Sequence, residues 1–231
     1  MRHGAMRFLS SHWQLLALTA VLFALWHTPV VVPLKILIVF LHEFAHAAAA
    51  WLTGGWVEQI SLSPDQGGFT ITRGGNRFAI LSAGYLGSLS IGVVLLMLAL
   101  RSDADRLVTG ALGLILLLVT AFYVRDVFAV TFCIATGAGL LGMARFMGHA
   151  PNDMALRVIG LGSLIYVPFD IFDDTIARAG LPSDAHMLGA EFGGPTVLWG
   201  AIWLALSLAV TFGCLRYILG RDTNLRFDRT T

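Results

Sequence analysis

The chain of 231 residues is too apolar and too weakly charged to form an ordinary soluble domain. Hydrophobic residues make up 57% of it, only 13% of the residues are charged, and the mean hydropathy is +0.78. Soluble domains carry about 25% charged residues, so the excess apolar surface of this chain belongs in lipid. The formal net charge of +1 gives no indication of a surface for nucleic acid.

Seven apolar segments follow one another along the chain. A helix needs roughly 20 apolar residues to cross a bilayer, and each segment has about that length. The segments cover residues 13–32, 33–53, 78–100, 107–123, 125–146, 154–177 and 196–219. The sequence therefore predicts an all-α polytopic membrane protein, a bundle of about six to seven transmembrane helices.

We expect the first apolar segment to stay in the protein rather than to be removed as a secretory signal. Arg2 and Arg7 precede it, but the apolar run from Trp13 continues to Val32 without a small-residue cleavage site. Basic residues at both ends of the chain compete for the cytoplasmic side of the membrane. Seven full crossings cannot place both ends on one side, so either one segment is not a full crossing or the charge rule is overridden.

Residues 57–73 do not have the pattern of a membrane span. Two short alternating runs, one with Ile60 and Leu62 and the other with Phe69 and Ile71, are joined by Ser-Pro-Asp-Gln-Gly-Gly. Turn residues between two such runs predict a β-hairpin, which follows the second apolar segment. The glycines here lack the spacing of a phosphate-binding loop, so no nucleotide site is expected.

We expect one integral membrane domain over residues 1–231. The hairpin at 57–73 is then a short insertion, and residues 220–231 form a polar C-terminal tail. Cys133 and Cys214 both lie inside apolar segments, without the close Cys or His spacing of a metal site. We interpret them as small buried hydrophobic residues rather than as a disulfide or metal ligands.

The motif His42-Glu43-x-x-His46 indicates a metal site in the second apolar segment. Two histidines four residues apart lie on one face of a helix, so both imidazoles reach one tetrahedral metal ion. A glutamate beside a ligand can take a proton from a metal-bound water and later give it to the leaving amine. The alternative is a pair of hydrogen-bonded histidines in a bundle core, but three ionisable groups within one span are costly without a function.

A catalytic zinc ion takes a third protein ligand and leaves one position open. The best candidates in the remaining apolar segments are Asp170, Asp173 and Asp174, which share a helix face just after Pro168. Asp170 lies deepest in its segment, so we favour it as the third ligand, with Asp173 and Asp174 as alternatives. A second interpretation is that the three carboxylates mark the polar end of the span and face water.

Four stretches of the chain together carry a resemblance to a known family. They are the motif of His42, Glu43 and His46, the hairpin, Ala83-Gly84-Tyr85-Leu86-Gly87-Ser88, and Asp170-Ile171-Phe172-Asp173-Asp174 followed by Ser183-Asp184-Ala185. With these stretches the chain resembles the site-2 protease superfamily of zinc intramembrane metallopeptidases, the M50 family, and more narrowly its M50B-like branch. The resemblance covers most of residues 33–205.

The resemblance implies that His42 and His46 bind zinc, that Glu43 is the catalytic base, and that a late-span aspartate completes the site. One departure concerns that aspartate: the family carries it in a Leu-Asp-Gly context, whereas Asp170 is followed by Ile171. The expected function is a zinc-dependent intramembrane endopeptidase, in which a zinc-activated water and Glu43 as general base hydrolyse peptide bonds of membrane-embedded substrates.

The expected partners are a transmembrane or membrane-associated protein substrate and the lipid bilayer, with no nucleic acid and no nucleotide. We expect a multi-pass protein of a bacterial plasma membrane. Two other functions remain open. An inactive scaffold would bind the metal and membrane clients without cutting them. A transporter or ion pathway would use the buried His, Glu and Asp residues, but it does not require the order of the motif, and no inverted repeat of spans is evident.

Overall fold

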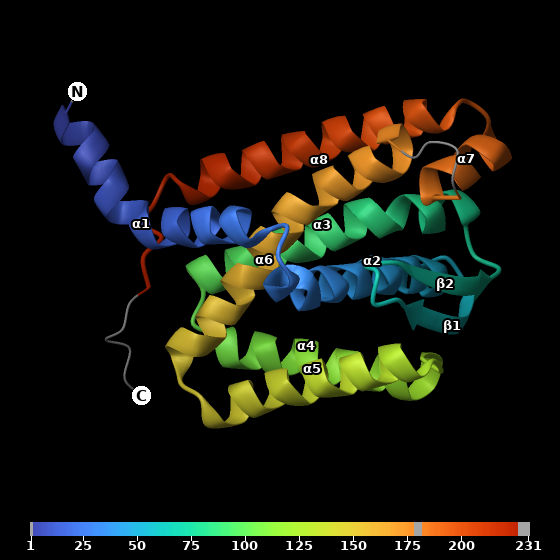
Figure 1. Cartoon of the computed structure of the whole chain (residues 1–231), viewed down its shortest axis with the longest axis horizontal. Helices are drawn as coiled ribbons and strands as arrows, with labels where there is room; N and C mark the ends of the chain where they lie inside the picture. Colours follow the sequence, from blue (N-terminus) through green and yellow to red (C-terminus); the bar gives the residue numbers. More distant parts are fainter. Residues whose placement is uncertain (1, 178–181, 226–231) are drawn as a thin grey trace.

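The computed structural model describes residues 2–177 and 182–225. The last part of the predicted polar tail, residues 226–231, lies outside the described residues. The described chain is a bundle of long helices with a small hairpin at one end (Figure 1).

The elements alternate long helices with short connections. In chain order they are α1 (Arg2–Leu25), η1 (Pro29–Val31), α2 (Val32–Leu52), β1 (Trp56–Leu62), β2 (Gly68–Arg73), α3 (Arg77–Arg101), α4 (Asp105–Tyr123), α5 (Val127–Phe146), α6 (His149–Phe172), η2 (Asp173–Ala177), α7 (Asp184–Phe192) and α8 (Thr196–Ile218). Seven helical stretches of the described residues are long and apolar enough to cross a bilayer. This confirms the predicted all-α polytopic membrane protein.

The directions of the helices show how the two ends of the described chain are placed. In Figure 1, α2, α3, α4, α5, α6 and α8 alternate in direction, whereas α1 and α2 run the same way, one after the other. The start of α1 and the end of α8 therefore lie at one end of the bundle, which we call the terminal end. The hairpin and α7 lie at the opposite end, the hairpin end.

Local sequence explains where several helices begin. Pro29 and Pro33 lie in the first turns of η1 and α2. Backbone N–H groups there have no partner inside the helix, so the missing N–H of proline loses no hydrogen bond. Asn76, Asp126 and Ser183 precede α3, α5 and α7, and each side chain accepts a hydrogen bond from the backbone N–H three residues ahead, at 3.0, 2.7 and 3.3 Å. Such caps satisfy N–H groups that have no partner inside the helix.

The predicted hairpin is present and lies against α2. β1 and β2 pair antiparallel, with an irregularity between Val57 and Gln59. Ile60 is buried on one side, while Phe69 and Ile71 are exposed, so the alternation in the sequence marks the two faces of the sheet. The second edge of β1 touches the end of α4 through a bridge from Ile60 to residue 124. β1 is thus bounded by protein along both of its edges.

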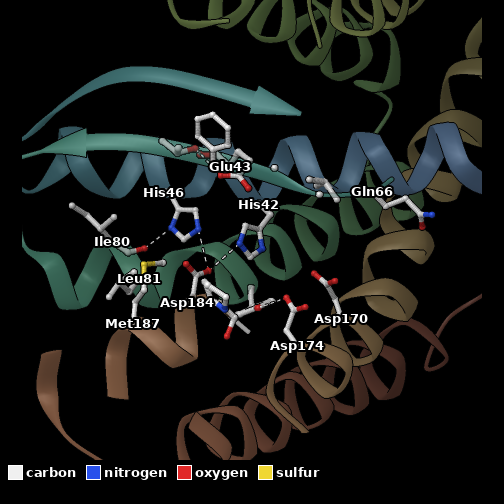
Figure 2. A pocket seen from close by; sticks show the side chains of 18 of the residues that line it. His42, Glu43, His46, Gln66, Ile80, Leu81, Asp170, Asp174, Asp184 and Met187 are labelled. Carbon is white, nitrogen blue, oxygen red and sulfur yellow. Dashed lines mark hydrogen bonds and ion pairs between the residues drawn. The ribbon is translucent and has the colours of Figure 1, made fainter. Parts of the chain in front are cut away.

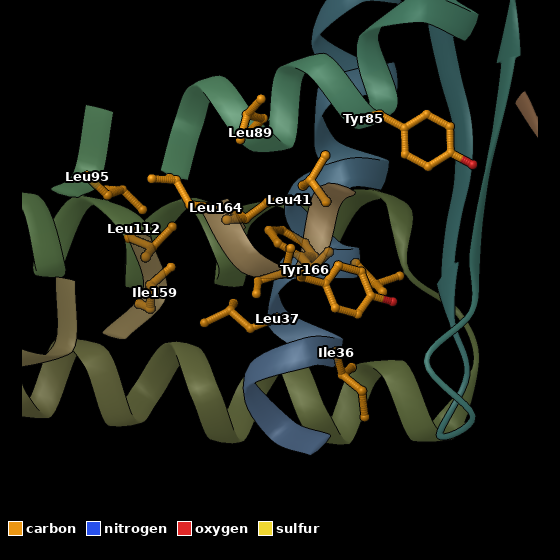
Figure 3. Close-up of a cluster of buried hydrophobic side chains, with 14 of the residues drawn as sticks. Ile36, Leu37, Leu41, Tyr85, Leu89, Leu95, Leu112, Ile159, Leu164 and Tyr166 are labelled. Atoms are coloured by element: carbon orange, nitrogen blue, oxygen red, sulfur yellow. The ribbon is translucent and has the colours of Figure 1, made fainter. Parts of the chain in front are cut away.

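The core of the bundle forms where α2, α3 and α6 meet. Leu41, Leu89 and Leu164, one from each of these helices, belong to the same buried cluster (Figure 3). The most hydrophobic windows of α2 and α6 are 61% and 67% buried, against 22% for α5 and for α8. The helix that carries the His42-Glu43-x-x-His46 motif is therefore central, and α5 and α8 face outward.

Candidate metal centre

Three side chains converge at the hairpin end of the bundle. His42 and His46 come from α2, and Asp184 is the first residue of α7. The Oδ2 atom of Asp184 lies 3.0 Å from Nε2 of His42 and 3.1 Å from Nε2 of His46. One ligand atom from each residue falls within 4.8 Å of the others. Figure 2 shows both imidazoles directed at the Asp184 carboxylate.

The two histidines meet because α2 is regular through the motif, which puts positions i and i+4 on one face. Asp184 reaches them because the Ser183 cap fixes the start of α7. Two contacts hold α7 against the start of α3. An ion pair joins Arg77 Nε and Glu191 Oε1 at 3.0 Å, and the rings of Phe78 and Phe192 meet edge to face.

The second nitrogen of His46 fixes the orientation of its ring. His46 Nδ1 lies 2.7 Å from the carbonyl oxygen of Ile80. Because a carbonyl only accepts, Nδ1 carries a proton. Nε2, which faces Asp184, is then the atom that could bind a metal ion after losing its own proton. A backbone carbonyl in this position is a common support for a histidine that binds a metal.

Gly84 of α3 forms the wall behind the two imidazoles. A Cβ atom at this position would lie 2.4 Å from His42 Nε2 and 2.6 Å from His46 Nε2. The space next to both donor atoms is therefore kept open by the absence of a side chain. Two imidazole nitrogens and one carboxylate oxygen are a donor set that catalytic zinc sites use, so these residues fit a metal ion of this kind.

The charge of Asp184 suits the same role. Burial alone would raise the pKa of Asp184, but the neighbouring His46 and His42 hold the pKa of this carboxyl well below its usual range. Asp184 is thus ionised and negatively charged, as a metal ligand must be.

Glu43 lies beside this group and is held by the hairpin. Its side chain is buried, and its Oε2 accepts a hydrogen bond of 2.8 Å from the hydroxyl of Thr70 in β2. The same hydroxyl lies 3.0 Å from the backbone carbonyl of Glu43. Gly68 closes over the carboxylate, since a Cβ there would lie 2.7 Å from Oε1. Strand β2 therefore fixes the position of Glu43.

A cavity of about 430 Å³ connects these residues. His42, Glu43, His46 and Asp184 line it together with the hairpin turn, and Asp170 and Asp174 stand on another wall (Figure 2). Tyr85 spans the two groups: its ring packs edge-on against His42, and its hydroxyl donates to Asp174 Oδ2 at 2.7 Å.

The structure brings together three of the predicted site residues, His42, Glu43 and His46. Asp170 and Asp174 line the same cavity but are not among the three converging side chains, and Asp173 is not one of the described residues that line it. Asp184 takes the third position. Asp184 lies outside the apolar segments that contain the predicted candidates, although the Ser183-Asp184-Ala185 stretch belongs to the family resemblance.

Comparison with known proteins agrees with this geometry. A model of the family described as Peptidase M50B-like matches residues 15–214, a range that contains the whole cavity. Comparison with curated proteins and with solved structures gives no match. The family is one of membrane peptidases, and the motif, the group of possible metal ligands and most of the bundle lie within the matched range. The chain therefore belongs to the Peptidase M50B-like family, as its resemblance to the site-2 proteases predicts.

Proposed function

We propose that the protein is a zinc-dependent endopeptidase that cuts peptide bonds of membrane-embedded proteins. The observation that carries this proposal is the convergence of His42, His46 and Asp184 next to a buried glutamate, Glu43, in a bundle of helices long enough to cross a membrane. The proposed location is a bacterial plasma membrane, as expected from the sequence.

His42 Nε2, His46 Nε2 and Asp184 Oδ2 would hold the zinc ion. Asp184 is proposed as the third ligand in place of Asp170, because its carboxylate oxygen is the one that meets both imidazoles. When bound, zinc polarises the scissile carbonyl and makes a water molecule more acidic.

Glu43 is proposed as the general base. Its position one residue after His42 brings its carboxylate to the same cavity as the ligand atoms. There it accepts a proton from the attacking water and donates it to the leaving amine. The hydrogen bond from Thr70 restricts the carboxylate to one orientation, so less ordering is needed when the substrate arrives.

Strand β2 is proposed to hold the substrate in an extended form. A transmembrane helix hides its peptide bonds in its own hydrogen bonds, so the segment to be cut must unwind before it reaches the site. Residues 67–70, just before and at the start of β2, line the cavity. β1 already pairs with β2 on one edge and has a bridge to residue 124 on the other. An unwound substrate can add to the second edge of β2 by backbone hydrogen bonds.

The first test is the zinc content of the purified protein, measured by elemental mass spectrometry. We expect about one zinc ion per chain in the wild type, and a loss of most of it in His46→Ala and in Asp184→Ala. Asp170→Ala is the matched control, since it removes a carboxylate from the same cavity. Retention of zinc by Asp184→Ala and its loss from Asp170→Ala would restore Asp170 as the ligand.

The second step separates a peptidase from an inactive scaffold. Glu43→Gln should keep zinc but lose cleavage, because an amide cannot act as a base. Quantitative proteomics of membranes from cells with wild type or Glu43→Gln should show membrane proteins that stay full-length only with the variant. If both proteins hold zinc and no membrane protein differs between the two samples, the scaffold function replaces the peptidase. A protein that binds no zinc would favour the ion pathway.

A further inference from the structure

A second polar cavity, of about 270 Å³, lies at the terminal end of the bundle, away from the metal centre. The end of α3, the start of α6 and the residues after α8 surround it. Each of these positions marks the end of a membrane-spanning stretch. The cavity therefore lies at the level where lipid headgroups meet the protein.

Three arginines line this cavity, and two of them are anchored. Arg157 Nε donates to Asp153 Oδ1 at 2.8 Å, which pairs its charge. Arg101 Nη2 donates to the carbonyl of Ile218 at 2.7 Å. Arg221 makes no side-chain hydrogen bond or ion pair with the residues that the structure describes. Its positive charge repels that of Arg101. A group of opposite charge between these two guanidinium ions would remove the repulsion.

Two residues that line the cavity each have one buried polar atom without a hydrogen-bond partner in the described part of the chain. One is a donor, Arg101 Nε, and the other is an acceptor, Asn224 Oδ1. The amide of Asn224 is oriented by its Nδ2 atom, which donates to the carbonyl of Ser10 at 2.7 Å. Buried polar groups in proteins are almost always paired. The unpaired donor and the unpaired acceptor thus belong to residues that line the same cavity.

We propose that this cavity binds the headgroup of a zwitterionic phospholipid, phosphatidylethanolamine. The phosphate accepts hydrogen bonds from Arg101 Nε and from the guanidinium of Arg221. The ammonium donates to Asn224 Oδ1 and lies near the carboxylate of Asp222, which also lines the cavity. Both unpaired atoms are then satisfied by one ligand.

The charges and the size of the cavity select this class of lipid. Three arginines and three aspartates line the cavity, so their formal charges cancel and a polyanionic headgroup would leave excess negative charge. A free phosphate would satisfy the donor but not the acceptor. A volume of about 270 Å³ is below the roughly 300–1,000 Å³ of pockets for drug-sized ligands. The headgroup fits, and the acyl chains remain in the bilayer.

The test is native mass spectrometry of the detergent-purified protein with phosphatidylethanolamine, phosphatidylcholine or phosphatidylglycerol added at equal concentration. We expect ethanolamine lipid to bind most tightly, because its ammonium has N–H donors and that of choline has none. Arg221→Gln should weaken this binding about tenfold. Arg216→Gln is the matched control: it removes the same charge from an exposed position of α8 outside the cavity, and should bind as the wild type does.

Thermal unfolding of each variant shows that it is folded, which is expected because Arg221 supports no contact between described elements. Equal binding of choline and ethanolamine lipids, or unchanged binding by Arg221→Gln, would overturn the proposal. So would inorganic phosphate alone if it displaced the lipid from the wild type, since free phosphate would then be the ligand. The test measures lipid binding and not zinc content or cleavage. A negative result for lipid binding would therefore leave the proposed peptidase activity unaffected.

Discussion

Thr70 is placed to control the proposed base, because its hydroxyl donates to the Glu43 carboxylate. Thr70→Val keeps the branched shape but removes the donor. We expect the cleavage rate at saturating substrate to fall about 10- to 100-fold, since a hydrogen bond to a charged group is worth roughly 1.5–3 kcal/mol. The KM and the zinc content should stay close to wild type, because Thr70 is not a ligand.

Thr70→Ser is the control, since it restores the hydroxyl without the methyl group and should recover most of the rate. The pH profile of cleavage provides a second readout, because a merely structural role for Thr70 would leave it unchanged. A Thr70→Val enzyme with the wild-type rate and profile would refute the positioning role.

Gly84 makes room for the two imidazoles. In Gly84→Ala the new Cβ would lie within 2.6 Å of Nε2 of both His42 and His46, so one ring has to move. We expect this variant to fold but to lose most of its zinc, as elemental analysis would measure. Gly142→Ala, in α5 with no atom near the added Cβ, should keep its zinc. Full zinc content in Gly84→Ala would mean that the histidine positions in the metal-bound protein differ from those seen here.

The sequence predicts those residues of the site that lie close together along the chain. His42, Glu43 and His46 lie within little more than one helical turn, so their spacing alone predicts that they meet. Asp184 comes 142 residues after His42 and stands on a short helix outside every apolar segment. No local pattern marks a contact that depends on how α7 packs against α3. The metal-binding roles of all these residues remain predictions.

At the scale of elements, the long spans and the hairpin could be predicted because each has a strong periodicity or a long apolar run. Helix α7 could not, since nine residues are too few to be stable as a helix without tertiary contacts. A second feature that the sequence does not predict follows Pro168. α6 continues through this proline to Phe172, and the backbone widens only afterwards, in the π-helical turn Asp173–Ala177. Wide turns of this type are frequent near functional sites.

The hairpin provides a test of the proposed substrate strand. Thr72→Pro would remove one backbone donor from β2 two residues beyond Thr70, and would leave the hydroxyl that contacts Glu43 in place. We expect cleavage of a membrane substrate identified with Glu43→Gln to fall at least tenfold, mainly through a higher KM, with zinc content unchanged. Thr72→Val keeps the backbone N–H and serves as the control. Wild-type cleavage by Thr72→Pro would exclude strand addition along this part of β2.

In the whole molecule, the middle of α1 lies next to the end of the described chain. The backbone N–H of Thr223 donates to the carbonyl of Ser11 at 3.0 Å, and Asn224 donates to Ser10. Variants with one added cysteine, Ser10→Cys and Gly220→Cys, should therefore be labelled by a membrane-impermeant maleimide from the same side of the membrane. Asp65→Cys, in the turn of the hairpin, should be labelled from the other side. Both native cysteines are buried and should not react.

Labelling of Ser10→Cys together with Asp65→Cys would instead mean that α1 makes a separate crossing before α2. The sequence could not decide between these topologies, because the length and apolar character of α1 suit either one. What favours one side for both ends is a tertiary feature, the set of hydrogen bonds that ties residues 10 and 11 to residues 223 and 224.

The distance along the chain between the proposed ligands has a consequence for biosynthesis. The two histidines are made early, but the aspartate follows only after four further long helices, α3 to α6, have been synthesised. A nascent or wrongly assembled chain then has just two of its three donors and holds zinc weakly. A bound ion would link residues 42 and 184, which enclose more than half of the chain, and this link would form last. Proteolysis inside the membrane would thus begin only after the bundle has been completed.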